Sequence, residues 1–384
     1  MRKKWNKRTD KQLRWHRKRS LFMTLLLGFL ALNFGVRSYY GKANHNNVSL
    51  TTQPLPELGT INILKNSIGD SIDSIMYVKH DPLLIDGNED FLRQGALEGW
   101  YGDGTSSDPI IIANYNITND SGTLLAIKNT DLHFQIHSNL LTGHFSHGGF
   151  SFGKGISLEN VTHGRIVNNL ISHINFGIYL EASIANIFLN NTFDMTTYGI
   201  TMNASDFNSV KMNIFERTFV VMELFKCSNN TLVGNICQNG WNGILLKSFS
   251  KNNDLKNNTF FNHTWNGVFL DSTTNKNLVK WNDFLGNSRH RGLAQASDDG
   301  SQNTFVFNYW DEYTFPDADF DSIVDNPYPI EGDANNSDQD PRVVPNIPNN
   351  LPYISPLPTH FTDFYIVILG FSTLVIFVRQ RKKG

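Results

Sequence analysis

Cysteine is nearly absent from this chain of 384 residues, which contains Cys227, Cys237 and no third cysteine. The chain can therefore form one internal disulfide at most. Ten residues separate the two thiols, and that separation need not bring their Cα atoms within the ~7 Å that a bridge requires. Whether they are bridged stays open at this point. So few thiols also leave few soft ligands for a metal such as copper.

Positive charge is scarce between the two ends of the chain. Residues 1–20 hold ten Lys and Arg against one acid, and residues 379–384 hold four more. Without these segments the chain has 33 − 14 = 19 basic and 35 − 1 = 34 acidic residues, a net charge of 19 − 34 = −15. The amino-terminal basic segment leads directly into an apolar run, which favours membrane insertion over nucleic-acid binding. We expect no nucleic-acid partner.

Two apolar runs lie beside these basic ends. Residues 21–36 would span about 24 Å as a helix, which is short for a ~30 Å hydrocarbon core. They can be a signal anchor or the apolar part of a signal peptide, and the bulky residues that come after them favour retention. Residues 361–378 predict a transmembrane helix. Basic residues flank both runs, so the positive-inside rule places residues 1–20 and 379–384 in the cytoplasm and the main domain outside the cell membrane, in an extracellular or periplasmic space.

The body between the runs divides by composition. Residues 37–81 are a polar linker of unknown fold, and residues 82–310 hold a repeat. Residues 311–340 are acidic and contain no Lys or Arg. Residues 341–360 are Pro-rich and predict a semi-rigid stalk before the membrane helix. An insertion at residues 142–154 interrupts the repeat and is expected to project from it.

The repeat has a period of about 22 residues, which its asparagines reveal. The spacing is 22 residues from Asn169 through Asn235, and a longer series shares the register: Asn139, Asn169, Asn191, Asn213, Asn235, Asn258, Asn282 and Asn308. An apolar residue lies three positions before and two positions after each of these. A further pair with i, i+2 spacing comes after the recurring glycines, as at Ile178 and Leu180. Alternation of this kind is the period of a strand.

Such a unit cannot bury its apolar residues alone, whereas stacked copies bury a continuous column. The sequence therefore predicts an all-β protein, a right-handed parallel β-helix solenoid with coils of about 22 residues and flanking transmembrane helices. The asparagines predict a ladder in which each side-chain amide bonds to its equivalent in the next coil.

Three passages resemble the NosD-like right-handed β-helix family. They are GDGTSSDPIII at residues 102–112, the repeated Asn-x-Ile/Phe, and Asn308-Tyr-Trp-Asp with the acidic residues 317–330 after it. The resemblance covers roughly residues 82–340. It implies membership of the carbohydrate-binding and sugar-hydrolase superfamily that includes pectate lyases, and a member of this family helps to mature a copper site in the periplasm. The fold is well specified by such a resemblance, whereas the activity is not.

Two sets of residues are candidate metal ligands. Asp317, Asp319, Asp321 and Asp325 occupy positions 1, 3, 5 and 9 of a calcium-loop pattern, although position 12 is Tyr328 and not Glu. Calcium is the one cofactor that the sequence suggests, and a solvated acidic cap is the alternative. His133 and His163 share a slot on successive coils ~4.8 Å apart, so they are candidate ligands of one copper or zinc ion.

Candidate sugar-contacting residues lie in outward slots. Glu159 and Glu181 are expected to stack on successive coils, with Tyr179 beside them and Asp271 further along. The three acids are candidate acid/base groups of a polysaccharide lyase, hydrolase or epimerase. Trp241 and Trp265 belong to a row of aromatics before the glycine slot and, with Tyr179, are candidate ligand-binding residues. The alternative, which the shifting offset of the row between coils favours, is that these aromatics stack on one another and stabilise the turn.

These observations leave three functions open. A membrane-anchored glycan-binding or surface scaffold module is our first expectation, with the lipid membrane and polysaccharide or surface glycans as partners. A polysaccharide lyase, hydrolase or epimerase is the alternative. The resemblance adds a third function, an accessory protein of copper-site maturation.

Overall fold

The computed structural model describes residues 77–120, 122–143, 153–288, 292 and 294–346. Residues 1–20, 21–36, 361–378 and 379–384 lie outside these ranges, as do most of the linker at 37–81, most of the insertion at 142–154 and the stalk beyond Asn346. The predictions for those segments stay predictions. Among the described residues, no helix has the length and apolar character that a membrane crossing requires.

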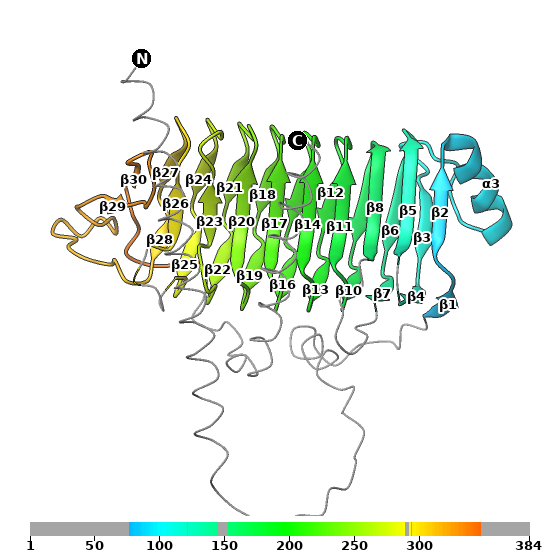
Figure 1. The fold of residues 1–384 in the computed structure, drawn as a ribbon, viewed down its shortest axis with the longest axis horizontal. Coiled ribbons are helices and arrows are strands. Elements are labelled where there is room, and N and C mark those ends of the chain that lie inside the picture. The colour runs from blue at the N-terminus through cyan, green and yellow to red at the C-terminus, as the bar shows by residue number, and fades with distance from the viewer. Residues whose placement is uncertain (1–76, 121, 144–152, 289–291, 293, 347–384) are drawn as a thin grey trace, which may run out of the picture. The chain divides into compact units, whose positions relative to one another are not determined.

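Three sheets run the length of the described region (Figure 1). Sheet A consists of β1 (Val78–His80), β4 (Tyr115–Asn119), β7 (Leu140–Gly143), β10 (Leu170–Ser172), β13 (Thr192–Asp194), β16 (Ile214–Glu216), β19 (Ile236–Gln238), β22 (Thr259–Phe261), β25 (Asp283–Leu285) and β28 (Tyr309–Trp310). Sheet B consists of β2 (Leu83–Asp86), β5 (Thr123–Thr130), β8 (Lys154–Val161), β11 (Phe176–Glu181), β14 (Tyr198–Asn203), β17 (Val220–Phe225), β20 (Asn242–Lys247), β23 (Val268–Leu270) and β26 (Ala296–Asp298). Sheet C consists of β3 (Ile110–Ala113), β6 (Phe134–His137), β9 (Gly164–Val167), β12 (Ile187–Leu189), β15 (Ser209–Lys211), β18 (Thr231–Val233), β21 (Asp254–Lys256), β24 (Leu278–Lys280), β27 (Thr304–Val306), β30 (Ser337–Asp338) and β29 (Tyr328–Pro329).

Each coil contributes one strand to each sheet, and strands from successive coils pair in parallel. Phe193 of β13, for example, is the partner of Ile171 in the coil before and of Phe215 in the coil after. The β29–β30 pair at the carboxyl end is antiparallel. The predicted right-handed parallel β-helix is therefore confirmed, together with the register that the asparagines indicate.

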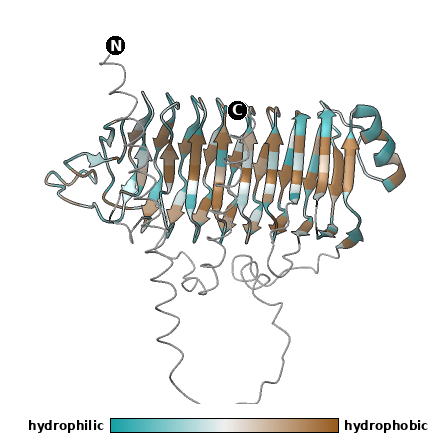
Figure 2. Cartoon of the chain, viewed as in Figure 1, coloured by the Kyte–Doolittle hydropathy of each residue, from teal (hydrophilic) through white to brown (hydrophobic). Residues whose placement is uncertain are grey.

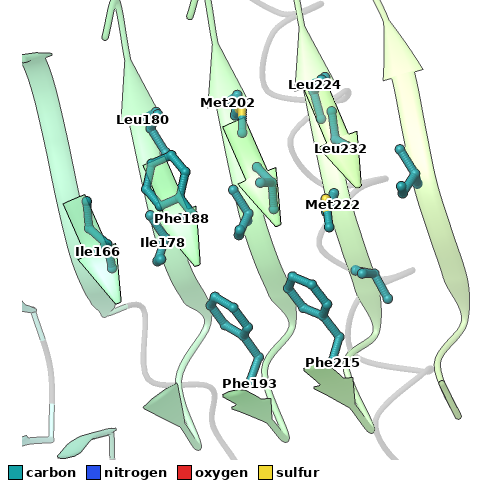
Figure 3. Close-up of a cluster of buried hydrophobic side chains, with 14 of the residues drawn as sticks. Ile166, Ile178, Leu180, Phe188, Phe193, Met202, Phe215, Met222, Leu224 and Leu232 are labelled. Carbon is teal, nitrogen blue, oxygen red and sulfur yellow. The ribbon is translucent and has the colours of Figure 1, made fainter. Parts of the chain in front are cut away.

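The inward slots form continuous apolar columns, as predicted. Ile178, Leu180, Ile200, Met202 and their equivalents are fully buried. Figure 3 shows Leu180, Met202 and Leu224 side by side on neighbouring strands, with Phe193 and Phe215 in the adjoining column. The Phe193 and Phe215 rings stack with centroids 4.5 Å apart. In Figure 2, apolar and polar residues alternate along the strands, which is typical of a sheet with one buried side.

The recurring glycines keep the space beside these rings open. A Cβ on Gly177 would lie 2.6 Å from the carbonyl oxygen of Gly199 and 2.6 Å from Cδ1 of Phe193. A Cβ on Gly199 would meet Phe215 at the same 2.6 Å. Glycine therefore lets the backbone of each coil approach the phenylalanine column.

The predicted asparagine ladder is present in the turn between sheets C and A. The backbone N–H and the side-chain Nδ2 of Asn191 both donate to Oδ1 of Asn213, at 2.9 and 3.0 Å. Nδ2 of Asn191 also donates to the carbonyl of Ile166. The pattern runs from Asn139 to Asn308, which donates to Asp338. The ladder thus satisfies buried turn groups that would otherwise lack partners.

A second ladder, in the turn between sheets B and C, was not predicted. It runs through Asn186, Asn208, Asn230, Asn253, Asn277 and Asn303. The double donation recurs except at Asn208, whose Nδ2 donates to the carbonyls of Ser183 and Asp206. Beside it, the hydroxyls of Ser183, Ser205 and Ser250 donate to backbone carbonyls, and Cys227 occupies the equivalent slot with its thiol 3.1 Å from the carbonyl of Phe225. The residues of this second ladder share the spacing of the first, so the sequence did contain the signal.

Both ends of the core are covered. At the amino end, α3 (Asn88–Glu98) lies beside β2 (Figure 1), and its Phe91 packs against Phe134 with ring centroids 5.3 Å apart. This helix was not expected from the sequence. At the carboxyl end, the Trp310 ring stacks on Phe284 and on Tyr328 at 4.1 and 4.0 Å. Segment 341–346 then crosses back over the last coils, where Arg342 pairs with Asp283.

Candidate functional site

The outer face of sheet B brings several of the predicted residues together. Glu159, Glu181 and Asn203 are register partners on β8, β11 and β14, and Ser157, Tyr179 and Thr201 form the row beside them. Both rows point outward because the residues between them fill the core. Side chains in each row repeat at the ~4.8 Å spacing of neighbouring strands.

Tyr179 is the centre of a hydrogen-bonded cluster on this face. Its hydroxyl donates to Oε2 of Glu181 at 2.9 Å, and Nδ2 of Asn203 lies 2.9 Å from each oxygen of the same carboxylate. The ammonium of Lys154 lies 3.8 Å from the centroid of the Tyr179 ring. Partial burial, together with the bond to Glu181, raises the pKa of Tyr179 to about 12. Burial lowers the pKa of Lys154.

Cations compensate the stacked carboxylates that the sequence predicted. Lys128 lies 2.7 Å from Glu159, and Lys247 lies 2.8 Å from Glu223 on the same face. Lys128, Glu159, Glu181 and Lys247 occupy one slot of the repeat, so inspection of that slot identifies Lys128 as well as Lys247. Positive and negative side chains therefore share this face. Glu159 is paired with Lys128, and Glu181 is bonded to Tyr179 and Asn203.

Asp271 lies outside this cluster and supports a turn. Its carboxylate accepts hydrogen bonds from the amides of Ser248 and Thr273, at 2.8 Å each, and from the Thr273 hydroxyl. Burial opposes ionisation of Asp271, but these bonds outweigh it, so the pKa of this group is lowered. A carboxylate held in this way is suited to fixing the backbone.

An aromatic row runs along the sheet B edge nearest sheet A. Phe176 and Tyr198 stack at 5.0 Å, Phe219 and Trp241 at 5.3 Å, and Trp241 lies 5.8 Å from Trp265. These five residues come from five successive coils, and we call them the aromatic row. Burial raises the pKa of Tyr198 to about 12. The predicted residues Trp241 and Trp265 thus lie on the edge of the same sheet that carries Tyr179.

His133 and His163 lie on successive coils, as their register predicted, and their rings stack with centroids 4.3 Å apart and planes at 14°. Nδ1 of His163 lies 3.0 Å from the Thr162 hydroxyl and 3.1 Å from the carbonyl of Asp131. The nitrogen lone pairs of stacked imidazoles lie in parallel ring planes. This arrangement favours stacking over the convergence on one ion that shared metal ligation requires.

The acidic segment groups three of the four predicted calcium ligands. One carboxylate oxygen from each of Asp317, Asp319 and Asp321 lies within 4.8 Å of the others. Asp325 is not in this group, and its Oδ2 accepts the amide of Ala318 at 3.0 Å. Carboxylate oxygens at such separations fit a hard cation such as calcium.

The cysteines are free and buried, and they lie in different parts of the coil. Cys237 faces the core in β19, whereas Cys227 belongs to the serine column of the turn between sheets B and C. Burial raises the pKa of the Cys227 thiol to about 12 and also raises the pKa of Cys237. Burial therefore disfavours the thiolate form of both side chains.

Comparison with known proteins identifies a family for part of the chain. No curated protein matches it. Residues 137–315 match the family model described as periplasmic copper-binding protein (NosD).

Solved structures of similar shape include three distant proteins. A tailspike protein 2 from Escherichia coli O157:H7 bacteriophage CAB120 is 12% identical with a TM-score of 0.43, over 61% of this chain and 34% of the tailspike. ORF18 of Geobacillus virus E2 is 15% identical with a TM-score of 0.36, over 67% and 65% of the two chains. The A-module of a mannuronan C-5 epimerase from Azotobacter vinelandii is 9% identical with a TM-score of 0.35, over 64% and 84%. The chain thus spans about a third of the tailspike's length, and likenesses this distant do not bear on function.

The family match begins at the last residue of β6 and ends shortly after β28. It therefore contains the coils whose asparagines and apolar columns carried the resemblance in the sequence. The region from 137 to 315 is a parallel β-helix that matches the NosD family model.

Proposed function

We propose that this chain is a glycan-binding β-helix and that the outer face of sheet B, with the aromatic row along its edge, is the binding surface. The observation that carries this proposal is the row itself, five aromatic residues on five successive coils beside outward polar residues. Phe219, Trp241 and Trp265 lie one position before the register of Phe176 and Tyr198. A polymer of sugars presents alternating apolar ring faces and hydroxyls. This surface offers aromatic rings for the ring faces and polar side chains for the hydroxyls.

The chemistry of the two rows supports a saccharide ligand. Aromatic side chains supply large apolar area to ring faces. Glu181, Asn203 and Lys247 supply acceptors and donors for hydroxyl groups. Because both rows repeat at the spacing of the coils, a linear glycan lying along the solenoid axis would meet similar contacts on each coil.

Affinity measurement with the purified protein tests this proposal. A panel of soluble polysaccharides identifies a ligand, and Trp241→Ala and Trp265→Ala should then each weaken its binding about tenfold. Phe207→Ala is the matched control, because Phe207 is exposed and lies in the turn between sheets B and C, away from the row. If the panel gives no ligand, or if the tryptophan variants bind as the parent does, the proposal fails.

Polysaccharide cleavage or epimerisation on the same face remains the alternative. Glu159 and Glu181 are the carboxylates that the sequence predicted on this face, yet Lys128 pairs with the first and Tyr179 and Asn203 bond to the second. A general acid needs a carboxyl held protonated, and hydrogen bonds to the ionised form act against that. This is why we place binding first.

We also propose that the acidic segment holds a calcium ion through Asp317, Asp319 and Asp321. The proximity of their oxygens supports it. Calcium should then protect residues 311–340 from proteolysis, and Asp319→Asn should remove that protection. Protection that is the same in chelator and in calcium would contradict the proposal.

We propose further that residues 21–36 and 361–378 anchor the chain in a membrane with the β-helix outside the cytoplasm. The support is the basic flank of each apolar run. The protein should stay with membranes through alkaline extraction, and protease added from outside should reach the body while sparing both ends. Release by alkali would contradict anchoring.

A further inference from the structure

The outer face of sheet C carries a concentration of lysines that the proposed function does not use. Lys256 and Lys280 are register partners on β21 and β24, and Lys251 and Lys276 lie in the turns that precede those strands. Lys251 and Lys276 are exposed. We call these four residues the lysine strip.

The strip has little internal compensation. Asp254 lies 2.9 Å from Lys256, and among the described residues the other three lysines have no carboxylate at ion-pair distance. The nearby acids Asp271 and Asp299 accept backbone amides, from Ser248 and from Asp333. Four cations with one paired acid stand out on a body whose net charge is 19 − 34 = −15.

An exposed aromatic pair lies directly beside the strip. Trp281 comes immediately after Lys280 in the chain, and its ring stacks on Phe307 of the next coil with centroids 4.9 Å apart. Trp281 remains 39% exposed. The residue in this slot one coil before is Asn257, and the Arg342 guanidinium carbon lies 5.4 Å from the centroid of the Trp281 ring.

The backbone of this pair is strained. Trp281 and Phe307 have φ of 57° and 55°, in the left-handed region that bulky residues avoid. Most other coils place an asparagine, a serine or a glycine in this slot, as at Asn168, Asn190, Gly234 and Asn257. Two aromatics held there against backbone preference suggest a functional use.

We propose that the lysine strip and the Trp281–Phe307 pair together form a second binding site, specific for an acidic, carboxylate-bearing polysaccharide. The aromatic pair would take the apolar face of one sugar ring, and the lysines would face its carboxylate and that of the next sugar. The site lies on sheet C, so it is separate from the surface proposed on sheet B.

Charge complementarity decides the class of ligand. A neutral glycan would not use the lysines, and an anionic lipid surface would not require the register of Lys256 with Lys280. A uronic-acid polymer presents ring faces and regularly spaced carboxylates together. Its binding should weaken as salt is raised, since exposed charge pairs are screened within about 10 Å at 0.1 M salt.

Binding of polygalacturonate to the full-length protein in detergent tests the proposal, with dextran as the neutral probe and phosphatidylglycerol vesicles as the lipid probe. The double variant Lys276→Gln/Lys280→Gln should weaken polygalacturonate binding about tenfold. Trp281→Asn should weaken it by a similar factor while keeping the melting temperature, because asparagine accepts the positive φ that tryptophan resists.

Two matched controls accompany these variants. Lys211→Gln removes an exposed lysine of the same sheet two coils away, and Phe207→Ala removes an exposed aromatic in another turn. Both should bind polygalacturonate as the parent does. Trp241→Ala should leave this site intact even if it abolishes binding on sheet B, so the two proposals can fail independently.

Three results with the polymers and vesicles would each overturn the inference. They are no binding of polygalacturonate, equal binding of polygalacturonate and dextran by the parent protein, and vesicle binding that depends on Trp281 when polygalacturonate binding does not. Unchanged affinity in both the lysine and the tryptophan variants would also overturn it.

Discussion

A single asparagine of the first ladder holds three coils together. Oδ1 of Asn213 accepts two hydrogen bonds from Asn191, and Nδ2 donates to Asn235 and to the carbonyl of Phe188. The residue is fully buried. Because buried polar groups without partners cost about 1–3 kcal/mol each, the side chain matters more through the groups it satisfies than through its own packing.

Asn213→Ala should therefore lower the free energy of unfolding by about 2–5 kcal/mol. Asn229→Gly is the control, since Asn229 is exposed in a turn with φ of 59° and glycine adopts that φ freely. Chemical denaturation measures both. Equal stability of Asn213→Ala and the parent would mean that the ladder contributes nothing.

Glu216 is a buried acid that links stability to pH. Burial raises its pKa above the usual 4.5, although bonds from Asn239 and Gln238 and the charge of Arg217 act in the opposite direction. The unfolded chain then loses this proton at a lower pH than the folded chain does. Glu216 therefore reduces stability progressively as pH rises from about 4.5 through its folded pKa.

Glu216→Gln should remove that dependence, so the variant should gain stability relative to the parent at pH 7 and gain less at pH 4. Denaturant midpoints at the two pH values provide the test, with Glu89→Gln on the exposed side of α3 as the control. A gain that is identical at both pH values would show that the proton is not involved.

Among the elements, the strands of the last coils depend on a segment from outside the repeat. Segment 341–346 places the Arg342 guanidinium 2.5 Å from Asp283, and both side chains are almost completely buried. Arg342 also donates to the carbonyls of Phe307 and Asn282. The segment thus connects β25 and β28 to the closing residues.

Arg342→Ala should destabilise the carboxyl-terminal coils by about 3–5 kcal/mol, because it removes the cation that faces a buried carboxylate. Hydrogen exchange should quicken in β25 and β28 while β11 and β14 keep their protection. Arg217→Ala is the comparison, since Arg217 pairs with buried Asp194 in the middle of the solenoid but remains 26% exposed. Uniform loss of protection along the solenoid would argue against a local closing role.

The sequence predicted those elements that repeat and missed those that occur once. Inward residues such as Ile200 and Phe215 were assigned correctly because the same position of the repeat is apolar in successive coils. Helix α3 buries one large side chain, Phe91, while its Leu92 and Leu97 are exposed, so its sequence has no clear amphipathic period. The Arg342–Asp283 pair joins residues 59 apart in the chain, and no local pattern encodes such a contact.

The candidate site was predictable to a similar degree. The shared slots brought Tyr179 close to Glu181, and the observed bond of 2.9 Å joins them. The partners Lys128 and Asn203 were readable from the same slot but were overlooked. The stacking of His133 on His163 depends on ring orientation, which the register alone does not determine.

For the molecule as a whole, the family description raises copper binding. The described cysteines are buried with raised pKa values, and Met202 and Met222 lie in the core. His263 is buried, and burial lowers its pKa to about 4. Both cysteines and the two core methionines are thus committed to packing, which does not favour a copper site built from them, whereas Met212 is exposed.

We predict no tight, stoichiometric copper binding. Titration of the purified protein with Cu(I) and with Cu(II) measures this, and His133→Ala/His163→Ala is the variant for comparison. A single site of nanomolar affinity that the double variant lacks would restore copper handling as the function.

The proposal that this β-helix holds glycans without cutting them is open to one decisive assay. The purified protein is incubated with a polysaccharide panel, and both retention and new chain ends are measured. We predict that at least one polysaccharide is retained, that no unsaturated or reducing ends accumulate, and that Trp241→Ala reduces the retention. New chain ends that disappear in Glu159→Gln or Glu181→Gln would refute the proposal and identify the protein as an enzyme.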